Sequence, residues 1–248
     1  MPVVLAKDSW RVGNLLLSAL PPEDRDRLFP HLELVQLAGG QVLYRSTERI
    51  AHFYFPVDSA VARVGVDRHG ATAEHVLIGK EGLVGLNALL GDLHASADAI
   101  VQIPGRSYRA GVAALGDFFE RSPQLRHTIL RYVSTRVFQT SQCSLCNARH
   151  SVAQRLSRWL LQALDCAGRA ELRVTHELIG VALGLRREAV TVTLLRLQAR
   201  GLIRCGRGRI AVPERARLEA ASCECYAAIR RELKTMALDI GALDIGGL

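Results

Sequence analysis

The spacing of hydrophobic positions divides the chain into a strand-rich first part and a helical second part. Between residues 31 and 110, short runs rich in Val, Ile, Tyr and Phe alternate with Gly and polar turns, as in residues 60–66 and 73–78. Many short strands separated by such turns are typical of an antiparallel sandwich, roll or barrel. Ahead of them, residues 1–30 predict a short helical lead-in, in which two prolines followed by two acidic residues mark a helix start.

After residue 110 the hydrophobic period becomes that of helices. Residues 113–120 predict a short helix, and Ser122, a good N-cap before Pro123, opens a long one that runs to about Asn147. A long amphipathic helix after a β domain needs a surface that covers its apolar stripe. We therefore predict that the stripe is the seam of a homodimer, with packing inside the same chain as the alternative. The predicted seam residues are Leu125, Ile129, Val133 and Val137.

The most specific pattern lies in residues 175–203. Thr175 can cap a first helix that ends at Gly184, and a second helix from about 186 to 200 ends at Gly201. The second helix has apolar positions three or four apart, with Leu195 alongside them; they are Val190, Leu194 and Leu197. Two helices joined by a short turn with a glycine predict a DNA-binding helix-turn-helix. An ordinary pair of packed helices is the alternative.

The outer face of the second helix carries side chains that suit DNA. The candidates at its start are Arg186, Arg187, Glu188, Thr191 and Val192. The first residues of a recognition helix reach base edges in the major groove, where Arg can bind guanine and Glu can accept from cytosine. The first arginine and the threonine could instead hold phosphates, which fixes position rather than sequence.

Two short strands after the second helix predict a β-hairpin wing. They flank the tight basic turn at residues 205–208, and they bring Arg207 and Arg209 to where these side chains could reach the DNA backbone or the minor groove. A wing beside a helix-turn-helix strengthens the prediction of double-stranded DNA as the partner.

The charge of the chain agrees with that partner. Lys and Arg total 32 against 24 acidic residues, a formal net charge of +8, and nine arginines fall between residues 186 and 217. A guanidinium group binds phosphate through two parallel hydrogen bonds. No apolar run reaches the roughly 18 to 20 residues that span a bilayer, and the start of the chain makes a poor signal peptide, so we expect a cytoplasmic protein with no membrane partner. No catalytic constellation stands out, so we do not expect an enzyme.

The order of these parts resembles the Crp/Fnr family of transcription regulators. The strongest motif runs from Leu183 to Val190 and continues through residues 201–203 and 207–210. The resemblance implies an α+β fold: an N-terminal antiparallel β-roll sensor that is cyclic-nucleotide-binding-like, a long dimerisation helix and a C-terminal winged helix-turn-helix. It also implies RNA polymerase as a further partner. The corresponding boundaries are 1–112, 113–149 and 150–236, followed by a disordered tail at 237–248.

The resemblance implies residue roles at the DNA. Arg187 and Glu188 match the Arg-Glu pair with which the family reads bases. Arg186 stands where many members have Ser or Thr, and Val192 stands where the best-known members have a further base-reading Arg. The DNA sequence bound by those members therefore does not transfer to this chain, and Val192 could contact a thymine methyl group instead.

The resemblance also points to an effector segment in the β part. Residues 79–85 are similar to the glycine-rich stretch of the family's effector pocket, which gives the candidates Gly79, Glu81, Gly82, Gly85 and Ser96. Cyclic-nucleotide binders hold the phosphate with an Arg and a small hydroxyl residue after this stretch. Residues 93–100 offer Ser96 but no Arg, and Asp98 would repel phosphate. We therefore do not expect a cyclic nucleotide as the ligand, and a purely structural turn is the alternative.

Four cysteines offer a different input for a signal. Cys143 and Cys146 lie three apart near the end of the long helix, and Cys223 and Cys225 form a second close pair. Four thiolates could bind zinc or an iron–sulfur cluster, or they could act as a thiol redox switch. A regulator that senses through these four residues is the alternative to one that senses through the β-roll, and small buried thiols with neither role remain a third reading.

The other cysteines and the histidines give weaker signals. His150 follows the first cysteine pair closely enough to be a further ligand. Cys166 and Cys205 stand alone in the sequence, and we predict that both are structural.

Overall fold

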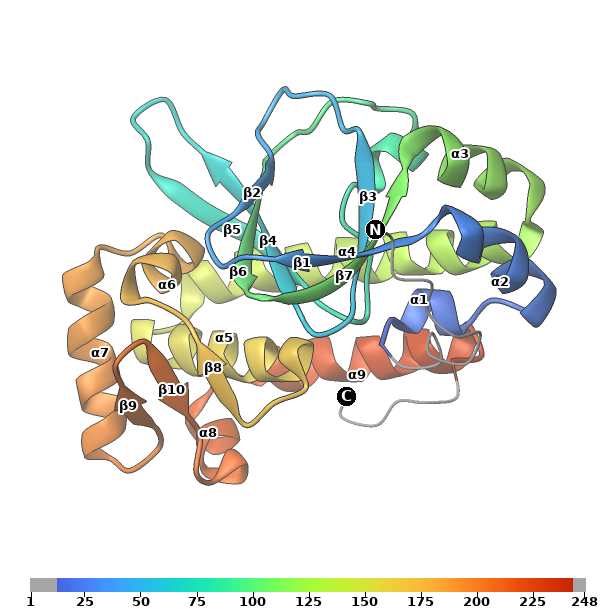
Figure 1. The fold of residues 1–248 in the computed structure, drawn as a ribbon. Coiled ribbons are helices and arrows are strands. Elements are labelled where there is room, and N and C mark those ends of the chain that lie inside the picture. Colours follow the sequence, from blue (N-terminus) through green and yellow to red (C-terminus); the bar gives the residue numbers. More distant parts are fainter. Residues whose placement is uncertain (1–12, 243–248) are drawn as a thin grey trace.

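The computed structural model describes residues 13–242, so predictions on residues 1–12 and 243–248 lie outside it. A β-rich N-terminal part lies above a long helix and a helical C-terminal part that carries its own small sheet (Figure 1). The predicted α+β fold, with an antiparallel β-roll ahead of a winged helix-turn-helix, is confirmed.

Seven strands in two antiparallel sheets form the β-roll. One sheet has the order β1-β7-β3 and the other the order β2-β6-β4-β5. Their bounds are β1 Glu33–Leu37, β2 Val42–Tyr44, β3 His52–Pro56, β4 Ala60–Val66, β5 Thr72–Ile78, β6 Asp98–Ile103 and β7 Gly105–Gly111.

Strand β4 carries apolar side chains on both of its faces, and this explains why four of the five residues 60–64 are hydrophobic, with Arg63 as the exception. Val61 belongs to the core inside the roll, whereas Ala60, Ala62 and Val64 belong to a second core that the C-terminal part completes. Successive side chains of a strand point to opposite faces. The roll therefore packs its outer face against the rest of the molecule.

Short helices close the ends of the roll. They are α1 Leu15–Ser18, α2 Pro22–Leu28 and α3 Val112–Arg121, together with the 3-10 turns η2 Phe29–His31 and η3 Leu86–Leu90. Asn14 caps α1 through its side-chain oxygen, and its amide donates to the carbonyls of Pro56 (3.0 Å) and Gly82 (2.9 Å). The predicted lead-in of two short helices is thus confirmed for the described residues.

The long helix α4 spans Pro123–Arg149 and begins where the sequence predicts. The Ser122 hydroxyl accepts from the Leu125 backbone N–H at 3.0 Å, which satisfies one of the free donors at the helix start. The helix α9, Glu224–Asp239, packs along α4. Arg131 joins the two helices through Glu232 (2.9 Å) and Asp239 (2.6 Å).

The described part of the predicted tail is ordered, which corrects the prediction of disorder from residue 237. The last turn of α9 includes Ala237, and Ile240 and Ala242 are almost fully buried beside it. Their apolar side chains fill the core near α1, so burial outweighs the entropy of a free end. No helix among residues 13–242 combines the length and apolar character needed to cross a bilayer.

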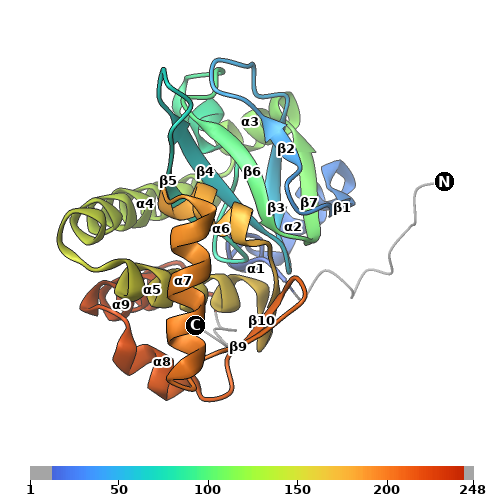
Figure 2. The same cartoon turned by 90° about the vertical axis from the view of Figure 1, so that its left-hand side faces the viewer.

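The C-terminal part is built around the helix-turn-helix (Figure 2). Its helices are α5 Val152–Ala167, α6 His176–Leu183, α7 Arg187–Ala199 and α8 Arg215–Ala221, and its strands are β8 Glu171–Arg173, β9 Arg204–Gly206 and β10 Arg209–Ala211. One core joins this part to the outer face of the roll, with Trp159 of α5 fully buried at its centre. The Trp159 ring N–H donates to Glu74 of β5 at 3.2 Å.

Candidate nucleic-acid interface

The turn between α6 and α7 has a backbone conformation that its capping threonine and its glycine predict from the sequence. Thr175 caps α6 by accepting from the Leu178 N–H at 3.2 Å. Gly184 ends the helix with φ +62°, a left-handed conformation that favours glycine, and the Leu185 N–H then donates to Gly180 at 2.9 Å. These local bonds fix the angle at which α7 leaves the turn, and α7 packs on α6 through Val190 and Leu194.

The first turn of α7 presents charge to solvent. Arg186 is the N-cap residue, and the side chains of Arg186, Arg187 and Glu188 are all exposed. Within the described part of the chain, none of these three side chains has a hydrogen bond or an ion pair. A helix N-terminus carries partial positive charge and free N–H groups, so two unpaired arginines there make a strong attraction for phosphate.

Thr191 has a different environment from its neighbours. Its side chain is half-buried, and its hydroxyl donates to the Arg187 carbonyl (3.0 Å) while the oxygen accepts from Nδ1 of His176 (2.9 Å). The hydroxyl therefore ties α7 to the start of α6. His176 was missed as part of the site because its partner lies 15 positions away. Leu195 is exposed rather than packed beside the buried stripe, whereas Val192 is exposed as expected.

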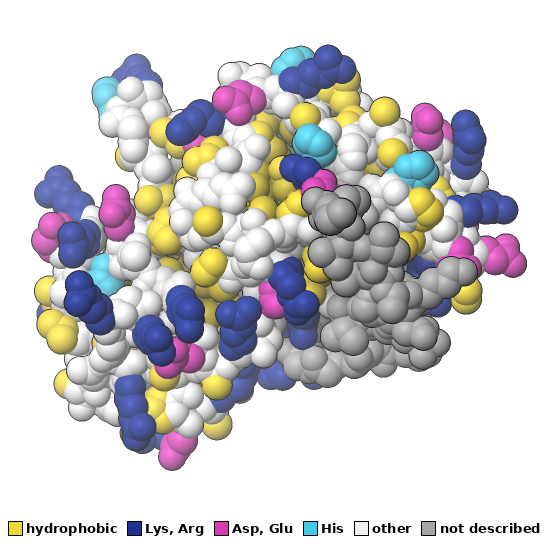
Figure 3. Space-filling model, viewed as in Figure 1, with side chains coloured by type: hydrophobic (Ala, Val, Ile, Leu, Met, Phe, Trp, Pro, Cys, Tyr) yellow, Lys and Arg dark blue, Asp and Glu magenta, His cyan; other side chains and the backbone are white. Residues whose placement is uncertain are grey.

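The wing has three strands instead of the predicted two, because β8 pairs with β10 and gives the order β8-β10-β9. Gly208 turns the hairpin with φ +68°, and Arg207 beside it is exposed. Arg209 has a long ion pair with Glu171 of β8, at 3.5 Å, and stays more than half exposed. Lys and Arg side chains gather over this winged part (Figure 3). Sequence reasoning missed the exposed Arg173 of β8, and it counted the exposed Arg204 of β9 among the basic residues without assigning it a DNA contact.

The long helix has two apolar stripes, and only one of them faces solvent. Leu125 and Ile129 are fully buried in the core of their own chain, which corrects their assignment to an open seam, and Val133 is half-buried. Of the predicted seam residues only Val137 is widely exposed. It belongs to a second stripe whose members and exposed fractions are Leu130 (53%), Val137 (63%), Phe138 (38%) and Leu145 (48%).

The glycine-rich segment 79–85 packs against the helices behind it. A Cβ atom at Gly79 would lie 2.7 Å from the Cα of Cys166 in α5, and one at Gly82 would lie 2.9 Å from Ile78. The Glu81 carboxylate is buried and accepts from the Gly79 N–H at 2.9 Å, and Gly85 has φ +98°. The described contacts of these residues serve the segment's own folding.

Ser96 lies apart from that segment, on the side of Arg63. The Arg63 guanidinium of β4 donates to the Ser96 hydroxyl at 2.7 Å, and the Asn87 amide donates to it at 3.1 Å. Asp98 accepts from the Ser46 N–H at 2.7 Å and lies 3.7 Å from Arg45. An arginine thus accompanies the hydroxyl residue after all, but it comes from 33 positions earlier, which reading residues 93–100 alone could not reveal.

The structure brings three of the four singled-out cysteines together and replaces the fourth. Cys146, Cys223 and Cys225 meet with His150, and their ligand atoms all lie within 4.8 Å of one another. Cys143 instead faces α5, where its sulfur lies 3.5 Å from Nη1 of Arg158. The set of four is therefore corrected to three cysteines and one histidine.

The remaining three thiols lie outside this cluster. Burial raises the pKa of Cys143, although the positive charge of Arg158 opposes this, and burial also raises the pKa of Cys166 and of Cys205. Cys143 and Cys166 are buried and Cys205 is half-buried, so these three positions fit small side chains with a structural role.

Comparison with known proteins agrees with this architecture. Residues 154–221 match the Crp-like helix-turn-helix domain family. FixK2 from Bradyrhizobium japonicum has a similar structure, with a TM-score of 0.66 at 17% identity over 77% of this chain and 98% of that one. A CRP-family transcriptional regulator from Thermus thermophilus gives 0.63 at 20% identity, over 76% and 96% of the two chains. The c-di-GMP-responsive global regulator from Xanthomonas campestris gives 0.63 at 17% identity, over 77% and 99%. No curated protein sequence matches the chain.

Proposed function

We propose that this chain is a transcription regulator of the Crp/Fnr family and that it binds a palindromic DNA site as a homodimer in the cytoplasm. The observation that carries the proposal is the first turn of α7, where Arg186, Arg187 and Glu188 are exposed and have no partner among the described residues. Charged groups left free at a helix N-terminus, on a net-basic chain, suit the base edges and phosphates of a major groove.

Each side chain of the interface has a distinct role in this proposal. Arg187 donates to O6 and N7 of a guanine, and Glu188 accepts from the amino group of the paired or neighbouring cytosine. Arg186 binds phosphate, and the exposed methyl groups of Val192 contact a thymine. Thr191 orients α7 through His176 rather than touching DNA.

The wing contributes contacts of a second kind in the same proposal. Arg207 and Arg209 bind the backbone beside the groove, so they add affinity without reading bases.

The second stripe of α4 supports the homodimer. Leu130 and Val137 are seven positions apart, and Phe138 and Leu145 repeat that interval, so the four side chains share one face of the helix. A second copy offers the same stripe, and two such helices bury each other's leucines around a twofold axis. The same axis would place the two copies of α7 on successive turns of a palindrome.

A signal received by the β-roll controls the regulator in this proposal. The outer face of β4 and β5 shares its core with α5 and α6, and the Thr72 hydroxyl donates to the Val181 carbonyl of α6 at 3.3 Å. A ligand that changed the roll would therefore change the surface on which the helix-turn-helix rests. Such a ligand shifts the balance between two placements of the DNA-binding domain in proportion to its preference for one of them.

The DNA proposal is tested by selecting bound duplexes from a random pool and measuring affinities by fluorescence anisotropy. We expect the selected site to be an inverted repeat. Arg187→Ala should weaken binding to it by about 1–3 kcal/mol, roughly 5- to 150-fold, and relax the preference at one base pair of each half-site. Arg121→Ala, which removes an exposed arginine on α3 far from α7 (Figure 1), is the matched control. Equal binding of all sequences by the parent and Arg187→Ala would refute the assignment.

The dimer is tested separately by sedimentation velocity at micromolar concentration. We expect twice the chain mass for the parent, and a dissociation constant raised at least about 30-fold in Val137→Glu because the seam would then bury an unpaired charge. Leu238→Glu changes an equally exposed leucine on α9 and should leave the mass unchanged. A Val137→Glu protein that remains as dimeric as its parent would remove the seam from the proposal.

A further inference from the structure

Three cysteines and a histidine meet where α4 ends and α9 begins. Cys146 and His150 are four positions apart, on one face of the last turn of α4. Cys223 is the N-cap residue of α9, and Cys225 lies in its first turn. The three cysteine side chains form a cluster of their own, separate from the cores on either side of it, and all three are buried. The DNA-binding function proposed above uses none of these four residues.

The separations between the four ligand atoms fit a single small ion. Sγ of Cys146 lies 3.5 Å from Sγ of Cys223, and Sγ of Cys225 lies 3.5 Å from Nδ1 of His150. No pair among the four is more than 4.8 Å apart. Ligands at zinc–sulfur and zinc–nitrogen bond lengths of about 2.0–2.3 Å occupy tetrahedral corners roughly 3.3–3.8 Å apart. Small side-chain rotations therefore suffice to bring all four onto one ion.

We propose that Cys146, His150, Cys223 and Cys225 bind one structural zinc ion in a tetrahedral Cys₃His site that joins the end of α4 to the start of α9. Four protein ligands leave no open position for water or substrate, so the ion serves folding and not catalysis. This inference does not depend on the proposed DNA binding.

Polar neighbours already hold two of the ligands in the required orientation. Nε2 of His150 lies 3.2 Å from the Glu224 carboxylate, which leaves Nδ1 to face the sulfurs. The Gln142 amide donates to Sγ of Cys225 at 3.2 Å. Zinc-bound histidines usually donate their second ring N–H to a carboxylate, which fixes the ring and raises its basicity.

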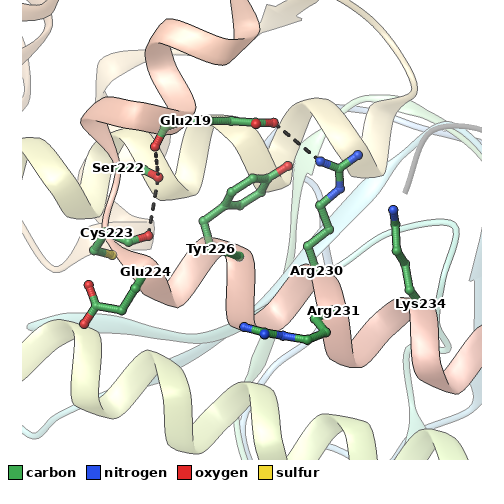
Figure 4. A pocket seen from close by; sticks show the side chains of 9 residues that line it. Glu219, Ser222, Cys223, Glu224, Tyr226, Arg230, Arg231 and Lys234 are labelled. Carbon is green, nitrogen blue, oxygen red and sulfur yellow. Dashed lines mark hydrogen bonds and ion pairs between the residues drawn. The ribbon is translucent and has the colours of Figure 1, made fainter.

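The charge and access of the site also suit zinc. Three thiolates and one Zn²⁺ leave one net negative charge, and Arg158 lies close enough to attract it. An open surface hollow of about 360 Å³, lined in part by Cys223 and Glu224, borders the site (Figure 4). In that hollow Arg230 pairs with Glu219 at 3.5 Å.

The same distances disfavour the two other functions that the sequence allows for these cysteines, an iron–sulfur cluster and a thiol redox switch. An iron–sulfur cluster places inorganic sulfide between several irons and needs its ligands spread around that larger body. A disulfide between Cys146 and Cys223 needs the sulfurs about 2.05 Å apart. It would not explain why Cys225, His150 and Glu224 lie around the same point.

The first test is the metal content of the full chain, produced without a histidine tag and analysed by plasma mass spectrometry after extensive dialysis. We expect one zinc per chain. Cys146→Ser and Cys225→Ser should each lose it, and Cys143→Ser should keep it because Cys143 faces Arg158 instead. Cys205→Ser, at a half-buried thiol of the wing, is a second control.

Two measurements keep the proposal falsifiable if the ligand variants do not fold. In the parent protein, a mercurial reagent should release zinc as it titrates three thiols, and cobalt exchanged into the site should give the visible bands of a tetrahedral ion with thiolate charge transfer. Glu224→Gln, at an exposed carboxylate, should fold normally and lower zinc affinity by about 10-fold or more.

Each remaining outcome would overturn the proposal. These outcomes are a zinc-free protein with free thiols at all three positions, a Cys146–Cys223 disulfide found by mass spectrometry, iron and sulfide in place of zinc, and zinc that stays bound in Cys146→Ser and Cys225→Ser alike.

Discussion

The start of α7 and the segment 79–85 both resemble motifs of the Crp/Fnr family, yet their side chains have opposite environments. At α7 the charged groups of Arg187 and Glu188 face solvent without a partner among the described residues. In the segment, the Glu81 carboxylate is buried and bonded to Gly79, and the glycines lie against α5 and β5. Exposed charged groups without partners in their own chain are free to bind another molecule. The polar groups of a fully hydrogen-bonded turn are already paired within the chain.

A sequence motif can thus persist because the fold needs its residues or because a binding partner needs them. Side chains at Gly79 and Gly82 would collide with neighbouring elements, which favours the structural turn that was the alternative to an effector pocket. The start of α7 keeps charged residues that no described contact of the fold requires. Substitutions at the two places should therefore fail in different assays, the first in stability and the second in DNA binding.

The largest effect is expected at Gly79. Gly79→Ala would force a methyl group against the backbone of Cys166, so α5 would have to move away from the roll, at a cost of about 3 kcal/mol in the free energy of unfolding. Denaturant titration followed by circular dichroism measures it. Gly116→Ala in α3, where nothing lies within 4 Å, is the control and should stabilise the protein by up to about 1 kcal/mol. Normal stability of Gly79→Ala would mean that the segment is free to serve a ligand.

The next effect concerns Glu74, which lies behind the same segment. Burial raises the pKa of Glu74 from 4.5 to about 7, against the opposing effects of Arg158 and the Trp159 N–H. Between these two pH values the folded protein holds a proton that the unfolded chain has released, so the free energy of unfolding falls as the pH rises from about 4.5 to about 7. The loss is about 3 kcal/mol and is complete above that window.

The measurement for Glu74 is a set of denaturant titrations between pH 4 and pH 8. Glu74→Gln keeps an acceptor for Trp159 but cannot ionise, so its stability should fall less over this range than that of the parent, by about the same 3 kcal/mol. Glu120→Gln, at a well-exposed carboxylate, should follow the parent. Parallel pH curves for the parent and Glu74→Gln would contradict a buried, protonated Glu74.

A smaller effect is expected at the wing. Arg207→Ala should weaken binding to every duplex by about 1 kcal/mol, roughly fivefold, and reduce the slope of log affinity against log salt by about 1, because a phosphate contact carries no sequence information. Its stability should match the parent, since Arg207 is exposed at a turn. Affinities at several salt concentrations test this, and a changed base preference would argue for base reading by the wing.

The smallest effect is expected at Thr191, which is on α7 but, like the residues of segment 79–85, is hydrogen-bonded within its own chain. Thr191→Val removes the hydrogen bond to His176 and should cost about 1 kcal/mol of stability, with a loss of DNA affinity well below that of Arg187→Ala. Thermal unfolding and anisotropy on the same preparation separate the two. An unchanged stability with an affinity loss as large as that of Arg187→Ala would make Thr191 a direct DNA contact.

Local signals in the sequence predict the helix-turn-helix well. Thr175, Gly184 and Gly201 act through their own backbone or through residues three positions away, so their roles can be predicted without knowing the fold. The start of α4 at Ser122 follows the same rule.

Features that depend on packing between distant elements were not predicted. The period of α4 shows that it is a helix, but only the position of α9 and the roll decides that Ile129 is buried while Leu130 is exposed. The sequence offers His150 as a further ligand, but that it takes the place of Cys143 beside Cys146 depends on α9 beginning beside the last turn of α4. The partner of Ser96 is Arg63 of β4, for the same reason.

Residues 151–222 leave α4 and return to it at one corner, because His150 and Cys223 are neighbours in space. The winged lobe, residues 151–222, is therefore connected along the chain to α4 and α9 at a single corner of the molecule. A rotation of this lobe that keeps α4 and α9 together has its pivot at that corner. Helix α7 lies far from the pivot and moves the most. The lobe is held against the roll by the core that β4 and β5 share with α5 and α6, so the strength of that packing sets how readily the lobe turns.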